Sequence, residues 1–154
     1  MPLNPEISRF IREHLDDNPD QLLWKKNEYP DDRVVVAVEQ IQARENIKEK
    51  LPSWYACQNI FYPSKLSTEQ CSSETTAPYK ARLTTGNSLC DLTGGLGVDT
   101  YFFSRQVDKV TYVERDKSYC EAARFNFLAL GATNIEVIHA DATTVANQVI
   151  ADTY

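Results

Sequence analysis

The stretch of sequence that decides the fold reads Leu89-Cys90-Asp91-Leu92-Thr93-Gly94-Gly95-Leu96-Gly97-Val98-Asp99. Its short apolar beginning predicts a buried strand, and the glycines that follow predict a sharp turn into a helix. In open parallel sheets, a strand–turn–helix unit of this kind binds a nucleotide-like ligand at the carboxyl ends of the strands. The glycine turn is therefore the first candidate binding site.

After the turn, the sequence alternates between helix and strand patterns. We expect strands at 88–92, 110–114 and 135–138 and helices at 98–106 and 117–130, the last ended by Gly131 as a C-cap. Repeated units of this length predict right-handed crossovers and a parallel sheet in the order 3-2-1. Residues 145–150 look like the helix before a fourth strand, so we expect the chain to be a fragment. The first strand would then keep an unpaired edge that favours self-association or contact with the missing half.

The residues before the glycine turn have a different composition. All seven prolines precede residue 79 and all five glycines follow residue 85, which predicts a boundary between 1–78 and 79–154. Apolar spacing predicts helices at 5–16, 19–26 and 32–50, and Asn4 and Asn18 suit the N-caps of the first two. We expect 52–78 to be irregular. The fold class is therefore α/β, with a helical N-terminal region followed by an incomplete Rossmann-like sheet.

Residues 66–77 are rich in hydroxyl groups and leave two interpretations open. In one, they form a polar loop that caps a helix beginning near Ser73. In the other, they form a lid in which Ser73 and Thr75 reach a ligand bound beside the glycine turn.

Composition narrows the possible functions. The 154 residues carry a net charge of −6, which does not favour a nucleic-acid surface. No apolar run approaches the length of a membrane span and no secretion signal is evident, so we expect a cytoplasmic protein without membrane contact. None of the four cysteines has metal-site spacing, and we expect Cys90 and Cys120 to be structural. His139 is expected to be structural too, and no metal site or catalytic residue is predicted.

Three ligand types compete for the turn. A phosphate-binding P-loop requires Gly-Lys-Ser/Thr, which the sequence lacks, and a dinucleotide site requires a third glycine where Thr100 stands. Asp91 and Asp99 on either side of the turn would repel a diphosphate and favour a ligand with an ammonium or sulfonium centre. S-adenosylmethionine carries both centres and no phosphate.

The acids at successive strand ends complete a set of contacts for this cofactor. Asp91 would attract the methionine end, directly or through water, while Gly95 and Gly97 let the backbone approach the ligand. Glu114, at the end of the second strand, would accept both ribose hydroxyls, and Asp141, after the third, would accept from the adenine amino group.

The segment that contains these residues resembles the class I S-adenosylmethionine-dependent methyltransferases. Their first motif, acid-x-Gly-x-Gly-x-Gly, appears as residues 91–97 with Thr93 in place of the first glycine. That departure resembles RNA guanine-N2 methyltransferases, whose turn runs Asp-x-Thr-x-Gly-x-Gly, and Thr93 could donate its hydroxyl to the carboxylate of the cofactor. Glu114 and Asp141 match the ribose and adenine contacts by position.

The whole chain is also similar to the N-terminal part of a bacterial methyltransferase family with a THUMP-like C-terminal domain. Residues 50–54 and 70–74 carry that similarity, which implies that Ser73 and Thr75 lie against the cofactor. The resemblance implies the cofactor-binding part of an RNA methyltransferase acting on a base nitrogen, inactive alone, with RNA contacts made by the missing region. The alternatives are a non-catalytic scaffold or regulatory module and a nicotinamide-dependent reductase.

Overall fold

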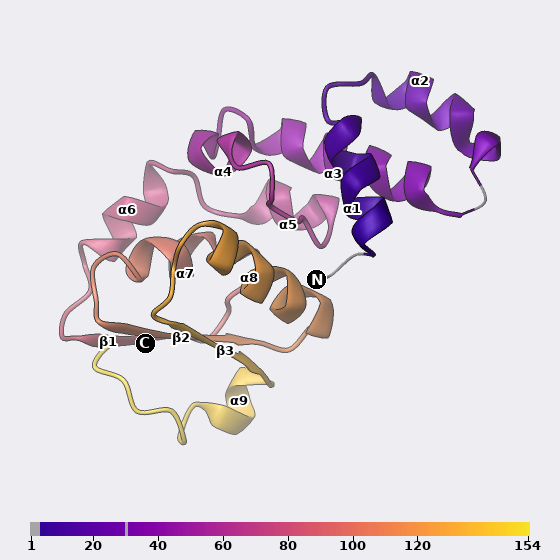
Figure 1. Ribbon diagram of the computed structural model, residues 1–154. Helices are drawn as coiled ribbons and strands as arrows, with labels where there is room; N and C mark the ends of the chain where they lie inside the picture. The colour runs from indigo at the N-terminus through magenta and orange to yellow at the C-terminus, as the bar shows by residue number, and fades with distance from the viewer. Residues whose placement is uncertain (1–3, 30) are drawn as a thin grey trace.

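The computed structural model of the chain describes residues 4–29 and 31–154. It begins with three α-helices and a 3₁₀-helix, which form a lobe at the upper right of Figure 1: α1 (Pro5–Glu13), α2 (Pro19–Trp24), η1 (Lys25–Glu28) and α3 (Arg33–Ile47). The Asn4 side chain accepts a hydrogen bond from the Glu6 N–H at 2.8 Å, and Asn18 caps α2 in the same way. Both predicted caps are present, although α1 ends at Glu13, short of the expected residue 16.

Three further helices connect this lobe to the sheet: α4 (Pro52–Ala56), α5 (Lys65–Gln70) and α6 (Thr76–Ala81). The expectation of an irregular segment over 52–78 is therefore wrong for much of its length. The helices are too short to show an apolar period, which explains why the sequence did not predict α4 and α5. Trp54 in α4 is fully buried, so tertiary packing stabilises what local propensity does not.

The second half is a three-stranded parallel sheet in the order β1-β2-β3, formed by β1 (Ser88–Asp91), β2 (Lys109–Glu114) and β3 (Ile135–His139). Figure 1 shows α7 (Val98–Phe103) and α8 (Lys117–Ala129) over one side of the sheet and α9 (Ala142–Val145) on the other. The predicted partial Rossmann-like architecture is confirmed, with each strand bound within one residue of expectation.

The last residues of the chain correct two predictions. The helix expected over 145–150 is absent, since α9 ends at Val145. The edge of β1 is not fully unpaired either, because Thr153 forms a parallel β-bridge with Leu89. The Cys90 N–H donates to the Thr153 carbonyl oxygen at 2.9 Å. The Asp152 carboxylate accepts from the Ser88 N–H at 2.9 Å and holds this pairing in place.

Buried amides tie the N-terminal helices to the sheet domain. The Asn126 side chain in α8 is fully buried and makes two 2.8 Å bonds with the Phe61 backbone N–H and C=O. The Gln40 side chain in α3 forms the same pair of bonds with Tyr62: its Oε1 accepts from the Tyr62 N–H at 2.9 Å, and its Nε2 donates to the Tyr62 carbonyl at 2.8 Å. The boundary at residues 78 and 79 stays a prediction, but one apolar cluster joins residues of α3 and α6 to those of α7.

The predicted structural residues lie as expected. Cys90 and Cys120 are buried free thiols. The His139 ring lies 3.0 Å from the Arg115 carbonyl oxygen, which gives it a structural contact at the end of β3. No helix among the described residues is both long and apolar enough to cross a membrane.

Candidate functional site

The glycine turn is held in shape by backbone geometry and one buried tyrosine. Gly95 and Gly97 have φ values of +54° and +89°, in the left-handed region that favours glycine. The Gly94 N–H donates to the Val113 carbonyl at 3.0 Å and so ties the turn to β2. The Tyr112 hydroxyl donates to the Gly95 carbonyl at 2.6 Å. The sequence pattern does not predict this role for Tyr112, because its position in an apolar strand indicates only a core residue.

The glycines meet different surroundings. A Cβ on Gly94 would overlap the Tyr112 ring, and one on Gly97 would lie 2.7 Å from Phe127 Cζ. These two positions need glycine because protein atoms already fill the space. A Cβ on Gly95 would meet only the Thr93 carbonyl oxygen, at 3.8 Å. Gly95 is therefore the glycine that leaves room for a ligand.

Three adjoining hollows surround the turn, and Thr93 lines all of them. The first, which we call the β2–β3 hollow, has a volume of about 620 Å³ and also contains Gly95, Glu114 and Asp141. The structure therefore brings together the predicted ribose and adenine acceptors beside the turn. Arg115, Asp116 and Tyr119 complete much of the wall.

The two acids of the β2–β3 hollow are fixed by neighbouring donors. Glu114 Oε2 accepts from the Gly95 N–H at 3.1 Å, and its Oε1 accepts from the Asp116 N–H at 2.9 Å. Asp141 Oδ1 accepts from the Thr143 N–H and hydroxyl, and these bonds lower the pKa of Asp141. A carboxylate has about four acceptor positions, so both groups keep capacity for further donors.

The second hollow, the α7 hollow, lies against the start of α7 and has a volume of about 290 Å³. It contains Gly95, Gly97 and Asp99 together with Ser72 and Lys80 from the α5–α6 region. Asp99 Oδ2 accepts from Ser72 Oγ and Lys80 Nζ, each at 2.8 Å. Lys80 therefore neutralises Asp99, one of the two acids expected to repel a diphosphate.

The third hollow, the β1 hollow, includes Asp91. Burial raises the pKa of the Asp91 carboxyl, whereas donors at Thr100 Oγ1, 2.5 Å away, and the Thr93 N–H, 3.1 Å away, act in the opposite direction. Asp91 forms no ion pair within the described part of the chain. It is the acid best able to attract a cationic ligand group, and Thr100 is its unpredicted support.

Ser73 and Thr75 line none of these three hollows. Ser73 Oγ instead accepts from the Thr76 N–H at 3.1 Å and lies 2.6 Å from Thr75 Oγ1. This is the helix-capping interpretation of the segment. The hydroxyl beside the turn is that of Ser72, one residue earlier.

The hollows fit the chemistry of S-adenosylmethionine. The β2–β3 hollow offers carboxylate acceptors suited to ribose hydroxyls and an adenine amino group. Asp99 Oδ1, at the α7 hollow, is buried and has no hydrogen-bond partner among the described residues, so it could accept from an ammonium group. Glu114, Asp141, Gly95 and the acids of the turn are thus the residues that would hold this cofactor.

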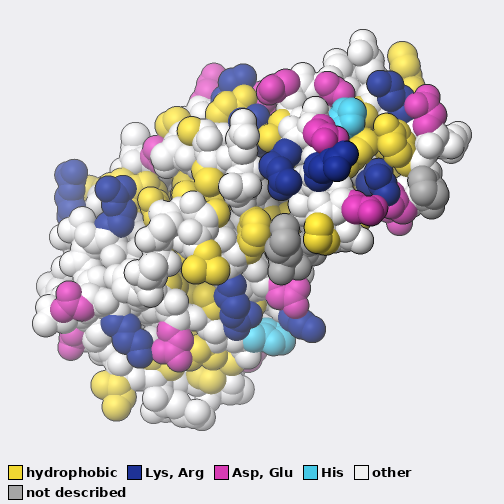
Figure 2. All heavy atoms as spheres, in the orientation of Figure 1, with side chains coloured by type: hydrophobic (Ala, Val, Ile, Leu, Met, Phe, Trp, Pro, Cys, Tyr) yellow, Lys and Arg dark blue, Asp and Glu magenta, His cyan; other side chains and the backbone are white. Residues whose placement is uncertain are grey.

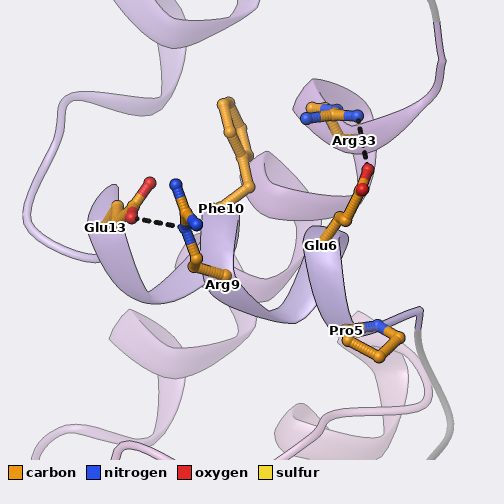
Figure 3. A pocket seen from close by; sticks show the side chains of 6 residues that line it. All are labelled: Pro5, Glu6, Arg9, Phe10, Glu13 and Arg33. Atoms are coloured by element: carbon orange, nitrogen blue, oxygen red, sulfur yellow. Dashed lines mark hydrogen bonds and ion pairs between the residues drawn. The ribbon is translucent and has the colours of Figure 1, made fainter.

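Figure 3 shows a further hollow, in the N-terminal lobe, lined by Pro5, Glu6, Arg9, Phe10, Glu13 and Arg33. Its charged side chains are paired with one another or with neighbours: Arg9 Nε lies 2.9 Å from Glu13, and Arg33 pairs with Asp31 at 2.7 Å and with Glu6 at 3.5 Å. Because these charges are already matched, the hollow resembles a helix–helix contact more than a ligand site.

Comparison with known proteins identifies the family. A family model described as protein-L-isoaspartate(D-aspartate) O-methyltransferase matches residues 18–149, which is most of the chain. The chain belongs to this methyltransferase family. The match includes the glycine turn and the strand ends that carry Glu114 and Asp141.

A solved structure agrees with this methyltransferase assignment. It is described as a "putative methyltransferase" from Porphyromonas gingivalis W83, is 31% identical and superposes with a TM-score of 0.74. The similarity covers 86% of this chain and 33% of that chain, so this chain spans about a third of the length of the structure it matches. No curated protein matches the chain. Family and fold together place it among the class I S-adenosylmethionine-dependent methyltransferases, as the sequence predicted.

Proposed function

We propose that this chain binds S-adenosylmethionine and forms the cofactor-binding part of a methyltransferase. The observation that carries the proposal is the shared β2–β3 hollow, in which Glu114 and Asp141 lie beside Thr93 and Gly95. When bound, the cofactor supplies an electrophilic methyl group. The chain's own residues bind and orient it: Glu114 takes the ribose, Asp141 the adenine, and Asp91 and Asp99 the ammonium group.

Two acceptor classes follow from different observations. The Asp-x-Thr-x-Gly-x-Gly turn at 91–97 favours an RNA base nitrogen, and a THUMP-like domain of a longer protein would bring the RNA. Membership of a family named for isoaspartate favours a protein carboxyl group. Figure 2 shows Lys and Arg interspersed with Asp and Glu on the visible face, without a continuous basic surface. The visible face and the net charge of −6 therefore give no support for RNA binding by this chain, and the family match favours the protein carboxyl group as the acceptor.

Calorimetric titration with S-adenosylhomocysteine tests the cofactor proposal. Glu114→Gln removes the charge but keeps an oxygen for the Gly95 N–H, so we expect about a tenfold weaker affinity from loss of a charge-assisted hydrogen bond. Glu136→Gln is the matched control, since Glu136 is half exposed on neighbouring β3 and pairs with Lys109. Absence of heat with the wild-type chain would favour the scaffold alternative, and a thermal shift with NAD instead would favour a reductase.

Methyl transfer from labelled S-adenosylmethionine separates the acceptor classes. An isoaspartyl peptide and a bulk RNA fraction should be offered in parallel, with base-labile label expected on the peptide ester and base-stable label on a methylated nucleobase. We propose that the chain alone transfers no methyl group to either, because the similarity covers only 33% of the solved methyltransferase that it matches. Turnover by the chain alone would contradict that part of the proposal.

A further inference from the structure

Lys80 connects three segments around the glycine turn. Its Nζ lies 2.8 Å from Asp99 Oδ2 in α7 and 2.9 Å from Ser72 Oγ in the segment between α5 and α6. Ser72 Oγ in turn donates to the same Asp99 oxygen. Lys80 itself belongs to α6, so one ammonium group joins the segment between α5 and α6 to the helix that follows the turn.

The position of Lys80 is unusual among the charged groups of the chain. It lines both the α7 hollow and the β1 hollow, and among the described residues it is the only Lys or Arg that lines either of them. An ammonium group has three donors, and two are used by Asp99 and Ser72. The third is available to an acceptor that enters these hollows, since the Lys80 side chain is 44% exposed.

The charges around these hollows match those of an amino-acid group. Asp91 lines the β1 hollow and carries no cation partner of its own, and the buried Asp99 Oδ1 also lacks a donor within the described chain. A free amino acid end carries one ammonium and one carboxylate group. The carboxylates of Asp91 and Asp99 can bind the ammonium group of the ligand. Lys80 is then the charged side chain that can bind the carboxylate of the ligand.

We propose that Lys80 binds the carboxylate of the methionine part of the cofactor, an inference that rests on the proposed cofactor function. Thr93, whose hydroxyl is expected to donate to the same carboxylate, lines the same two hollows. Asp99 and Ser72 act as positioning residues that hold the ammonium group of Lys80 at the turn. The segment between α5 and α6 thus contributes Ser72, which holds Lys80 at the turn, whereas Ser73 and Thr75 line neither hollow.

The test compares two ligands that differ only in the carboxylate. S-adenosylhomocysteine has it, and S-adenosyl-3-thiopropylamine lacks it while keeping the adenosine, sulfur and amine. We expect Lys80→Gln to weaken S-adenosylhomocysteine binding about tenfold, the low end for a charge-assisted bond because the site is partly exposed. Binding of the amine should change by less than about twofold. Lys80→Arg keeps the cation and should retain most of the affinity for S-adenosylhomocysteine.

Lys109→Gln provides the matched control, since Lys109 is an exposed lysine paired with Glu136 at the other end of β2. Equal losses for both ligands in Lys80→Gln would show that Lys80 only holds Ser72 and Asp99 together, and would overturn the inference. No loss for either ligand would overturn it too, as would an Arg variant that binds as weakly as the Gln variant. If the wild-type chain binds the amine but gains nothing from the carboxylate, the cofactor proposal stands and the Lys80 inference fails. If it binds neither ligand, both fail.

Discussion

Replacing Gly97 by alanine tests whether the glycine turn is fixed by packing as well as by backbone conformation. Gly97 has a φ of +89°, which costs an alanine about 1–2 kcal/mol. A lower entropy of the unfolded chain returns about 0.4–1 kcal/mol. The new Cβ would also lie 2.7 Å from Phe127 Cζ, and overpacking of this kind costs a further 1–3 kcal/mol or so. We therefore expect Gly97→Ala to destabilise the chain by about 2–4 kcal/mol.

Gly131→Ala separates the two contributions. Gly131 has a φ of +74°, but a Cβ there would meet nothing within 4 Å. It ends α8 in a two-bond C-cap, in which the Ala132 N–H donates to the Phe127 carbonyl at 2.8 Å. This control should lose only the backbone cost, about 1 kcal/mol. In a chain of this size, the difference between the two variants corresponds to a Tm roughly 5 °C lower for Gly97→Ala.

Thermal unfolding followed by circular dichroism measures both variants against wild type. Equal Tm values for Gly97→Ala and Gly131→Ala would refute the packing argument, since only Gly97 faces Phe127. A second variant locates the effect. Adding Phe127→Leu to Gly97→Ala removes the contacting ring atom, so the double variant should lose less than the sum of the two single changes. Strict additivity would contradict the proposed contact.

Three other changes have directions set by the structure. Tyr112 is fully buried, and Tyr112→Phe removes its hydrogen bond to the Gly95 carbonyl. Urea titration should show a free energy of unfolding that is about 1–2 kcal/mol lower. An unchanged value would mean that the turn does not depend on this hydrogen bond. Burial raises the pKa of the Asp91 carboxyl in the folded chain above its ordinary value of 3.8. The ionised form of Asp91 therefore lowers the free energy of unfolding as pH rises through the folded pKa, and this loss is absent below pH 3.8. The Tm of Asp91→Asn relative to wild type should therefore rise between about pH 3 and pH 7, and a pH-independent difference would contradict the burial effect. Asn126→Ala leaves the Phe61 N–H and C=O without their partner and should lower the free energy of unfolding by roughly 3 kcal/mol. A decrease of less than about 1 kcal/mol would show that water replaces the amide.

Sequence analysis predicted the elements whose signals are local. Asn4 and Asn18 cap their helices because each needs only N–H groups two or three residues away. The predicted bounds of the three strands and of α8 agree with the structure within one residue, since their apolar patterns are long enough to show a period. Short helices such as α4 carry no such pattern, and their formation depends on burial of residues such as Trp54 against distant parts of the chain.

The candidate site divides in the same way. Glu114 and Asp141 could be predicted to meet because the carboxyl ends of parallel strands share one edge of the sheet. The placement of Ser73 and Thr75 against the cofactor rested only on the family resemblance, and the direction of a polar loop depends on contacts that the sequence does not display. Lys80, in a helix of six residues, gave no signal at all.

The glycine turn, the parallel α/β units and the acids at their strand ends can be predicted from the sequence, because each follows from residues close together in the chain. Three other contacts follow from packing between distant parts of the chain: Tyr112 with the turn, Thr153 with β1, and Lys80 with Asp99. Each of these contacts joins residues 17 to 64 positions apart. Their geometry is set by the packing of whole elements, which no local pattern of residues encodes.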